Sequence, residues 1–235
     1  MILITAFIIW LKRKVGLNKA MFWTSFAILA FTLGSMFSLI MHEGFWKLSM
    51  FTYWMLLLGT FYFLVKSYGQ KWKITAKLDR SYNFQAFVTV NMTFMLTVVL
   101  LMLWPAQILH DFYGVGGGYI GYVPAFKSID SIFAWMISVE FIASMWIHFI
   151  LPIVLLFQLK NTKLKRTIGK GFYFSNIGLM SLYFIVSTST WAYTGGYGAY
   201  IVNSPAIIGH FIWLSFGIII TYYFVIQFFV AKYKR

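Results

Sequence analysis

The chain contains no cysteine, and few of its residues are charged. The lack of cysteine excludes disulfide bonds and thiolate metal sites. For the same reason, the sequence does not indicate whether the protein works in an oxidising or a reducing compartment. Charged residues make up 10% of the 235 residues, whereas a soluble domain usually carries about 25%. Hydrophobic residues reach 61% and aromatic residues 22%. This composition indicates an integral membrane protein, in which Trp and Tyr gather at the membrane interfaces.

Acidic residues are scarce, with five Asp and Glu against 19 Lys and Arg, so the formal net charge is +14. In a soluble protein this excess would suggest nucleic acid as a partner. Here all of the basic residues except Lys47 and Lys127 fall into four segments that alternate with apolar stretches. The positive-inside rule places such segments in the cytoplasm, where they attract anionic lipid. We therefore predict membrane lipid as a partner and no nucleic acid, and the sequence identifies no protein partner.

Six stretches are long and apolar enough to cross a membrane at roughly 20 residues per helix. They lie near residues 21–41, 47–66, 84–109, 131–159, 171–191 and 208–231. The sequence thus predicts an all-α, multi-pass protein of the cell membrane, with one six-helix transmembrane domain over residues 1–235. Both termini are expected in the cytoplasm. No internal repeat is evident, which gives little support to an inverted-repeat transporter.

The first 20 residues are predicted to form a basic cytoplasmic segment. Residues 1–11 are apolar but too short to span. A signal peptide carries its positive charge before the apolar stretch, whereas here "KRK" follows it. A helix lying in the inner membrane interface is the expected structure.

Polar residues inside the predicted spans are candidates for function, because burying them in hydrocarbon is unfavourable unless they are bonded. His148 lies twelve residues before Lys160, which places it about 18 Å above the inner boundary. Thr52 lies fourteen residues before Lys66, or about 21 Å above that boundary. The two residues are therefore predicted at nearly the same depth, in the outer half of the membrane.

The fourth predicted span carries a polar stripe. Glu140, Ser144, His148 and Pro152 are each four residues apart, a spacing that places them on one helix face. Such a stripe is typical of a cleft wall that is open to the outside. The alternative is structural, because Ser and His commonly bond across helices in membrane bundles.

The other histidines, His42, His110 and His210, fall at the predicted outer ends of spans, forming an outer-mouth group. Imidazole and carboxylate groups suit Zn²⁺, and acidic residues adjoin two of these histidines. However, no pair has the three- or four-residue spacing of helical metal ligands. We predict no metal site and no cofactor.

The segments "KLSMFTYWMLLL" and "IHFILPIVLL", together with the six-span layout, resemble the androgen-induced FAR-17a/AIG1 group and its bacterial Pr6Pr-like relatives. Members of this group hydrolyse lipid esters within the membrane with a threonine and a histidine. The resemblance implies that Thr52 and His148 are the catalytic pair. The "HxxHT" pattern often found near the histidine of this group is replaced here by "WIHFI".

The implied chemistry is physically reasonable. A threonine hydroxyl needs a neighbouring base to act as a nucleophile, and desolvation keeps a buried histidine neutral and able to accept a proton. Asn91, at a similar depth in the third span, is the best candidate for an oxyanion donor, and Glu140 and Ser144 would form the polar approach.

Three functions remain open from the sequence. The first is the intramembrane hydrolase of a lipid acyl ester. The second is a binding or transport subunit without chemistry, which captures a lipidic or small-molecule ligand from the outer side. The third is an interaction protein whose basic loops bind a cytoplasmic partner. The hydrolase requires Thr52 and His148 to face each other.

Overall fold

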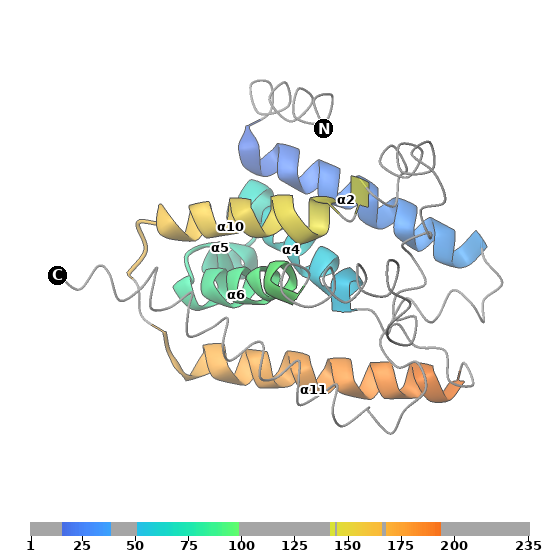
Figure 1. Cartoon of the computed structure of the whole chain (residues 1–235). Helices are drawn as coiled ribbons and strands as arrows, with labels where there is room; N and C mark the ends of the chain where they lie inside the picture. Colours follow the sequence, from blue (N-terminus) through green and yellow to red (C-terminus); the bar gives the residue numbers. More distant parts are fainter. Residues whose placement is uncertain (1–15, 39–50, 99–141, 144, 166–167, 194–235) are drawn as a thin grey trace.

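The computed structural model describes residues 16–38, 51–98, 142–143, 145–165 and 168–193 (Figure 1). Within these ranges the regular structure is entirely helical, which confirms the predicted all-α class. The elements are α2 (Leu17–Ser38), α4 (Phe51–Tyr68), the 3₁₀ turn η2 (Gly69–Lys71), α5 (Lys73–Asp79), α6 (Tyr82–Val98), the π-helix η4 (Trp146–Ile150), α10 (Leu151–Lys160) and α11 (Lys170–Tyr193).

Five of the six predicted spans overlap a described helix. Where a predicted boundary falls within the described residues, the two differ by a few residues, as for α2, which begins at Leu17 instead of near residue 21. The predicted end of the third span and the predicted start of the fourth lie outside the described residues. The sixth predicted span, 208–231, and the N-terminal segment 1–15 lie outside the described residues. In the described ranges, no helix combines the length and the apolarity that crossing a membrane requires.

Cross-helix contacts give the relative directions of the helices. Trp146 on η4 bonds to Ser25 near the middle of α2, and Gln158 near the end of α10 bonds to Asn18 at the start of α2. The helix of η4 and α10 is therefore antiparallel to α2. Tyr62 near the end of α4 bonds to Gln158 near the end of α10, so α4 and α10 run parallel.

The helices α6 and α11 also run parallel. Asn83 at the start of α6 accepts a hydrogen bond from the backbone of Gly169, just before α11, and Asn91 bonds to Asn176 about two turns further along both helices. Helices that follow one another along the chain thus alternate in direction. Figure 1 shows α11 lying along one side of the group formed by α2, α4, α6 and α10.

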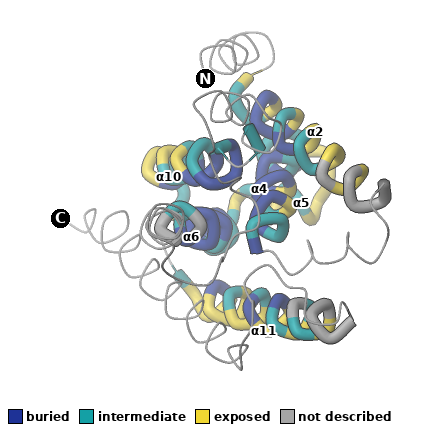
Figure 2. Tube along the Cα trace, turned by 45° about the vertical axis from the view of Figure 1, so that its right-hand side comes forward, coloured by how far each residue is buried: buried dark blue, intermediate teal, exposed yellow. Residues whose placement is uncertain are grey.

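The core lies between α4, α6 and the helix of η4 and α10. Met55, Leu56, Phe63, Met92 and Leu151 are almost fully buried there. The inner faces of these helices are buried, whereas the outer faces of α10 and α11 are exposed (Figure 2). Because large aromatic and aliphatic side chains fill this space, the helices pack through dispersion contacts as well as through area burial.

The outer sides of the bundle carry many exposed apolar side chains, including Trp23, Phe26, Phe157, Phe174 and Ile177. A globular helix in water usually places polar residues on its outer face. The long described helices instead carry apolar residues on their outer faces as well as on the faces that pack in the core.

The charged residues of the described ranges all lie at one end of the bundle. They sit at the start of α2 and α11, at the end of α4 and α10, and in the connection between α4 and α6. They are Lys19, Lys66, Lys71, Lys73, Lys77, Asp79, Arg80, Lys160, Lys163, Lys165 and Lys170. We call this end the basic end. The charged residues gather at this end because successive helices alternate in direction and the basic segments alternate with apolar stretches along the sequence.

The connection between α4 and α6, expected only as a basic loop, contains the ordered elements η2 and α5. Asp79, the one acidic residue in the described ranges, holds it in place. Its carboxylate pairs with Lys66 at 2.8 Å and accepts a hydrogen bond from Gln70 at 2.9 Å, and its carbonyl oxygen accepts one from Gln85. The connection is thereby tied to both α4 and α6.

Candidate functional site

His148 lies in the middle of η4, a single π-helical turn inside an otherwise α-helical segment. The turn is closed by the N–H of Leu151, which donates to the carbonyl of Trp146 five residues earlier. Pro152 explains its position. Proline has no N–H to donate to the carbonyl of His148, and its ring would clash with that carbonyl in a regular α-helix. The wider turn relieves this conflict, and such π-turns are frequent at functional sites.

The π-turn alters the polar stripe that regular α-helical spacing predicts. A π-turn contains more residues than an α-turn, so residues before Trp146 are rotated relative to those after Ile150. His148 and Pro152 are both buried. Glu140 and Ser144 lie outside the described residues, so the predicted polar approach to His148 stays a prediction.

The side chain of His148 is 9% exposed and its ring nitrogen Nδ1 has no hydrogen-bond partner among the described residues. Trp146, two residues earlier in the same turn, behaves differently, because it donates its indole N–H to the hydroxyl of Ser25 at 2.9 Å. Most buried polar atoms in folded proteins are bonded. An imidazole nitrogen without a partner is therefore a feature that packing alone does not account for.

Thr52 lies in the first turn of α4 and is partly buried. It precedes Gly59 by seven residues, which places the two on the same helix face. A side chain at Gly59 would meet the Leu151 Cδ1 atom at 3.4 Å, so this face of α4 packs against the helix that carries His148. The residue pair predicted from the sequence therefore occupies helices that are direct neighbours.

Two contacts between α4 and α10 give the relative heights of Thr52 and His148. Tyr62 and Gln158 are bonded and so lie at one level. Thr52 precedes Tyr62 by ten residues and His148 precedes Gln158 by ten, which gives Thr52 and His148 equal heights along the helix axes. Gly59 and Leu151 are in contact as well. Thr52 precedes Gly59 by seven residues and His148 precedes Leu151 by three, so on this measure their heights differ by about 6 Å. The two levels therefore agree within about one helical turn. The Nδ1 atom of His148 forms no hydrogen bond to Thr52.

Asn91 is fully buried on α6, at the side facing α11. Its amide nitrogen donates to the carbonyl of Phe87 and to Oδ1 of Asn176, both at 2.8 Å. An amide nitrogen has two hydrogens, so both donors of Asn91 are used within the bundle. Its Oδ1 atom has no partner among the described residues. In this arrangement Asn91 links two helices and has no N–H left for an oxyanion.

The outer-mouth histidines His42, His110 and His210 lie outside the described residues. Within the residues that are described, no group of three or more His, Asp and Glu side chains could hold a metal ion.

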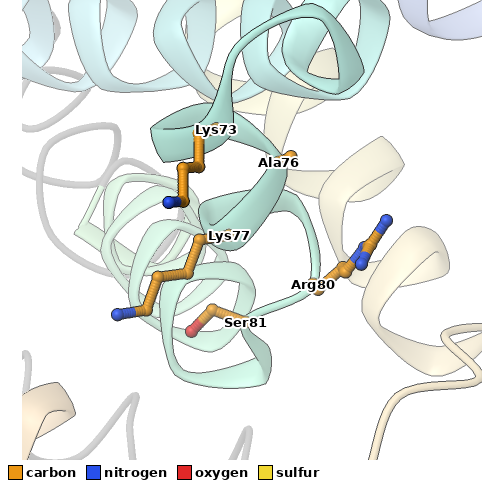
Figure 3. Close-up of a pocket in the computed structure, with 5 residues that line it drawn as sticks. All are labelled: Lys73, Ala76, Lys77, Arg80 and Ser81. Carbon is orange, nitrogen blue, oxygen red and sulfur yellow. The ribbon is translucent and has the colours of Figure 1, made fainter.

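An open pocket at the basic end was not anticipated from the sequence. Lys73, Ala76, Lys77, Arg80 and Ser81 line it. Figure 3 shows Lys73 and Lys77 extending in the same direction from α5, with the hydroxyl of Ser81 beside Lys77, and Arg80 extending the opposite way. The spacing of four residues between the two lysines was a readable signal, but it gains meaning only once α5 is known to be a helix.

Comparison of the chain with protein-family models, with curated proteins and with solved structures found no match in any of the three. The resemblance to the FAR-17a/AIG1 group therefore rests on the segments around Thr52 and His148.

Proposed function

We propose that this chain is a multi-pass protein of the cell membrane whose basic end faces the cytoplasm. The observation that supports this most strongly is the separation of charge from apolar surface. Every charged residue of the described ranges is at one end, and the sides of the helices expose large apolar residues such as Phe31, Phe174 and Ile185. Exposed apolar surface of this extent is typical of contact with lipid or with a protein partner, and cytoplasmic ends of membrane helices are rich in Lys and Arg.

Within that membrane domain, the function we propose is hydrolysis of a lipid acyl ester by Thr52 and His148. The observation that carries this proposal is the buried Nδ1 atom of His148, which no described residue bonds. A neutral imidazole with a free nitrogen lone pair can accept a proton from a hydroxyl nucleophile. The parallel neighbouring helices, and the agreement of the two heights within about one turn, support the pairing with Thr52.

The reaction that this pair would perform is acyl transfer to threonine followed by hydrolysis. The Thr52 oxygen attacks the ester carbonyl while His148 takes its proton, and His148 then returns the proton to the leaving alcohol. Water, deprotonated by the same imidazole, then attacks the acyl carbon of the threonine ester. The bond to the Thr52 oxygen breaks, His148 returns the proton to that oxygen, and the fatty acid is released. A position in the outer half of the membrane would place the pair near the ester carbonyls of a phospholipid or acylglycerol.

The experiment is a comparison of Thr52→Ala, His148→Ala and a control, Thr60→Ala, in turnover of a short-chain acyl ester by the purified protein. Thr60 lies on the same helix, and its hydroxyl already bonds to the carbonyl of Leu56 at 2.7 Å. Loss of a general base lowers rates by roughly 100-fold or more. We expect such a loss for Thr52→Ala and His148→Ala, and turnover close to wild type for Thr60→Ala. Wild-type turnover that is absent, or that survives both substitutions, would rule out the hydrolase.

The second candidate is a binding subunit that captures a lipidic ligand without chemistry. It is favoured by one specific observation, namely that both amide hydrogens of Asn91 are already bonded within the bundle. An acyl-transfer site needs a donor for the developing oxyanion, and Asn91 was the residue expected to supply it. A binding subunit would retain ligand affinity in Thr52→Ala while showing no ester turnover.

A further inference from the structure

The cluster of Lys73, Lys77 and Ser81 stands apart from the proposed catalytic pair, at the basic end of the bundle. The two lysines are one helical turn apart on α5, and both are exposed. Like charges at this spacing repel each other. No acidic partner offsets them in the described part of the chain, because the carboxylate of Asp79 is committed to Lys66 and Gln70.

The direction of Asp79 follows from its position in α5. Asp79 lies six positions after Lys73 and two after Lys77, which places it on the other side of the helix from the two lysines. On that far side, Thr75 donates to the carbonyl of Gly69, and so helps to hold α5 against η2. One face of α5 is therefore fixed to the bundle, and the opposite face presents two lysines.

Ser81 completes the pocket on the side of α6. Its oxygen accepts a hydrogen bond from the backbone N–H of Phe84 at 3.3 Å and so caps the start of that helix. The hydroxyl hydrogen remains available to donate to a ligand. The start of α6 carries no acidic residue in its first turn, so its dipole also favours an anion at this place.

We propose that the pocket formed by Lys73, Lys77 and Ser81 binds the phosphate group of an anionic phospholipid from the inner leaflet. Two lysines that extend in the same direction and one hydroxyl line this pocket from neighbouring elements (Figure 3), and ammonium and hydroxyl donors are the groups that bind a phosphate. Arg80 also lines the pocket, but its guanidinium group extends away from the two lysines, so we expect it to contribute little to this site.

A lipid is favoured over free phosphate by the apolar side chains next to the cations. Trp72 directly precedes α5 and is 57% exposed, and Ile74 within α5 is 77% exposed. Exposed Trp and Ile beside lysines are typical of segments that lie at a membrane surface, where the apolar groups enter the headgroup region. This assignment rests on the proposed membrane location, with the basic end on the cytoplasmic side.

The test is a titration of the full-length protein, in a neutral detergent, with a fluorescent phosphatidic acid. The variants are Lys73→Gln/Lys77→Gln and a control of equal charge change, Lys163→Gln/Lys165→Gln, which alters exposed lysines after α10. Given the usual contribution of one lysine to binding of anionic lipid, loss of both pocket lysines should raise the dissociation constant on the order of 25-fold. The control pair and Arg80→Gln should each change it less than about twofold, and all variants should keep the wild-type melting temperature.

Two further arms identify the source of the phosphate. The same lipid with a phosphocholine headgroup should bind at least about tenfold more weakly, and millimolar inorganic phosphate should not displace phosphatidic acid. Equal weakening by both double variants would mean diffuse attraction and overturn the site. Displacement by inorganic phosphate would overturn the lipid assignment. Extraction of membranes with alkaline carbonate reports separately on the proposed function, because release of the wild-type chain would contradict a membrane-embedded bundle whatever the titration gives.

Discussion

At the scale of single residues, His148 and Trp146 show two ways of burying a polar group in the same π-turn. Trp146 bonds to Ser25, whereas the Nδ1 atom of His148 has no partner among the described residues. Burying a polar group without a hydrogen bond costs about 1–3 kcal/mol in proteins. A residue kept under these conditions is a candidate for chemistry, because packing would favour an apolar side chain of the same size.

This difference predicts opposite effects of two substitutions on stability. His148→Leu should leave the melting temperature unchanged or raise it, because it removes a polar group that lacks a partner. Ser25→Ala should lower the free energy of unfolding by about 1–3 kcal/mol, because it leaves the buried indole N–H of Trp146 without an acceptor. Thermal unfolding in detergent measures both. A clear drop in melting temperature for His148→Leu would show that the imidazole is structural.

At the scale of the elements, Asn91 and Asn176 join α6 to α11. Replacing Asn176 with Leu leaves one amide hydrogen of Asn91 without an acceptor, which should cost about 1–2 kcal/mol. Replacing both residues with Leu should recover most of that loss, because no polar group is then left without its partner. The measurement is a double-mutant cycle of unfolding free energies, with the exposed neighbour Ser175→Ala as a control. Additive losses in the cycle would mean that the bond between the two amides contributes nothing.

Gly59 provides a second test of the helix packing. An added Cβ atom would lie 3.4 Å from Leu151 Cδ1 and 3.6 Å from Met92 Cε, which is ordinary contact. Gly59→Ala should therefore be tolerated, and the gain in helix propensity of about 1 kcal/mol should make it neutral or stabilising. Gly59→Leu should overpack the contact between α4 and α10 and cost about 1–3 kcal/mol.

The matched control for Gly59 is Gly178 on α11, where an added Cβ would meet nothing within 4 Å. Gly178→Leu should keep the wild-type melting temperature or raise it slightly. Equal destabilisation at the two glycines would argue against the close approach of α4 and α10, and with it against the register that brings Thr52 and His148 to similar heights.

The sequence was sufficient to predict helices where apolar residues run on for many positions, as in α4 and α11. It did not predict α5, because a stretch of seven residues with three charges is too short and too polar to stand out as a helix, and the helix depends on Asp79 contacts to Lys66 and Gln70. The π-turn at His148 had a readable signal in Pro152. The hydrogen bond from Asn91 to Asn176 had no readable signal, since it depends on which helix lies beside α6. The predicted roles of Thr52 and His148 stay predictions.

At the scale of the whole molecule, the proposed function depends on which side of the membrane the basic end faces. The described helices alternate in direction and bring every charged residue of those ranges to one end, while their sides expose apolar residues. The proposed membrane location would place the lysines against the anionic inner leaflet and the Thr52 and His148 pair in the outer half.

The most direct measurement uses the absence of cysteine, which makes any introduced cysteine a unique label site. Thr162 lies at the basic end just after α10, and Gly117 lies between the predicted spans 84–109 and 131–159, on the side predicted to face the outside. In intact cells, a membrane-impermeant maleimide should label Gly117→Cys and should label Thr162→Cys only after the membrane is opened. Labelling of Thr162→Cys in intact cells with protection of Gly117→Cys would contradict the orientation, and equal labelling of both without opening the membrane would contradict the membrane-embedded bundle.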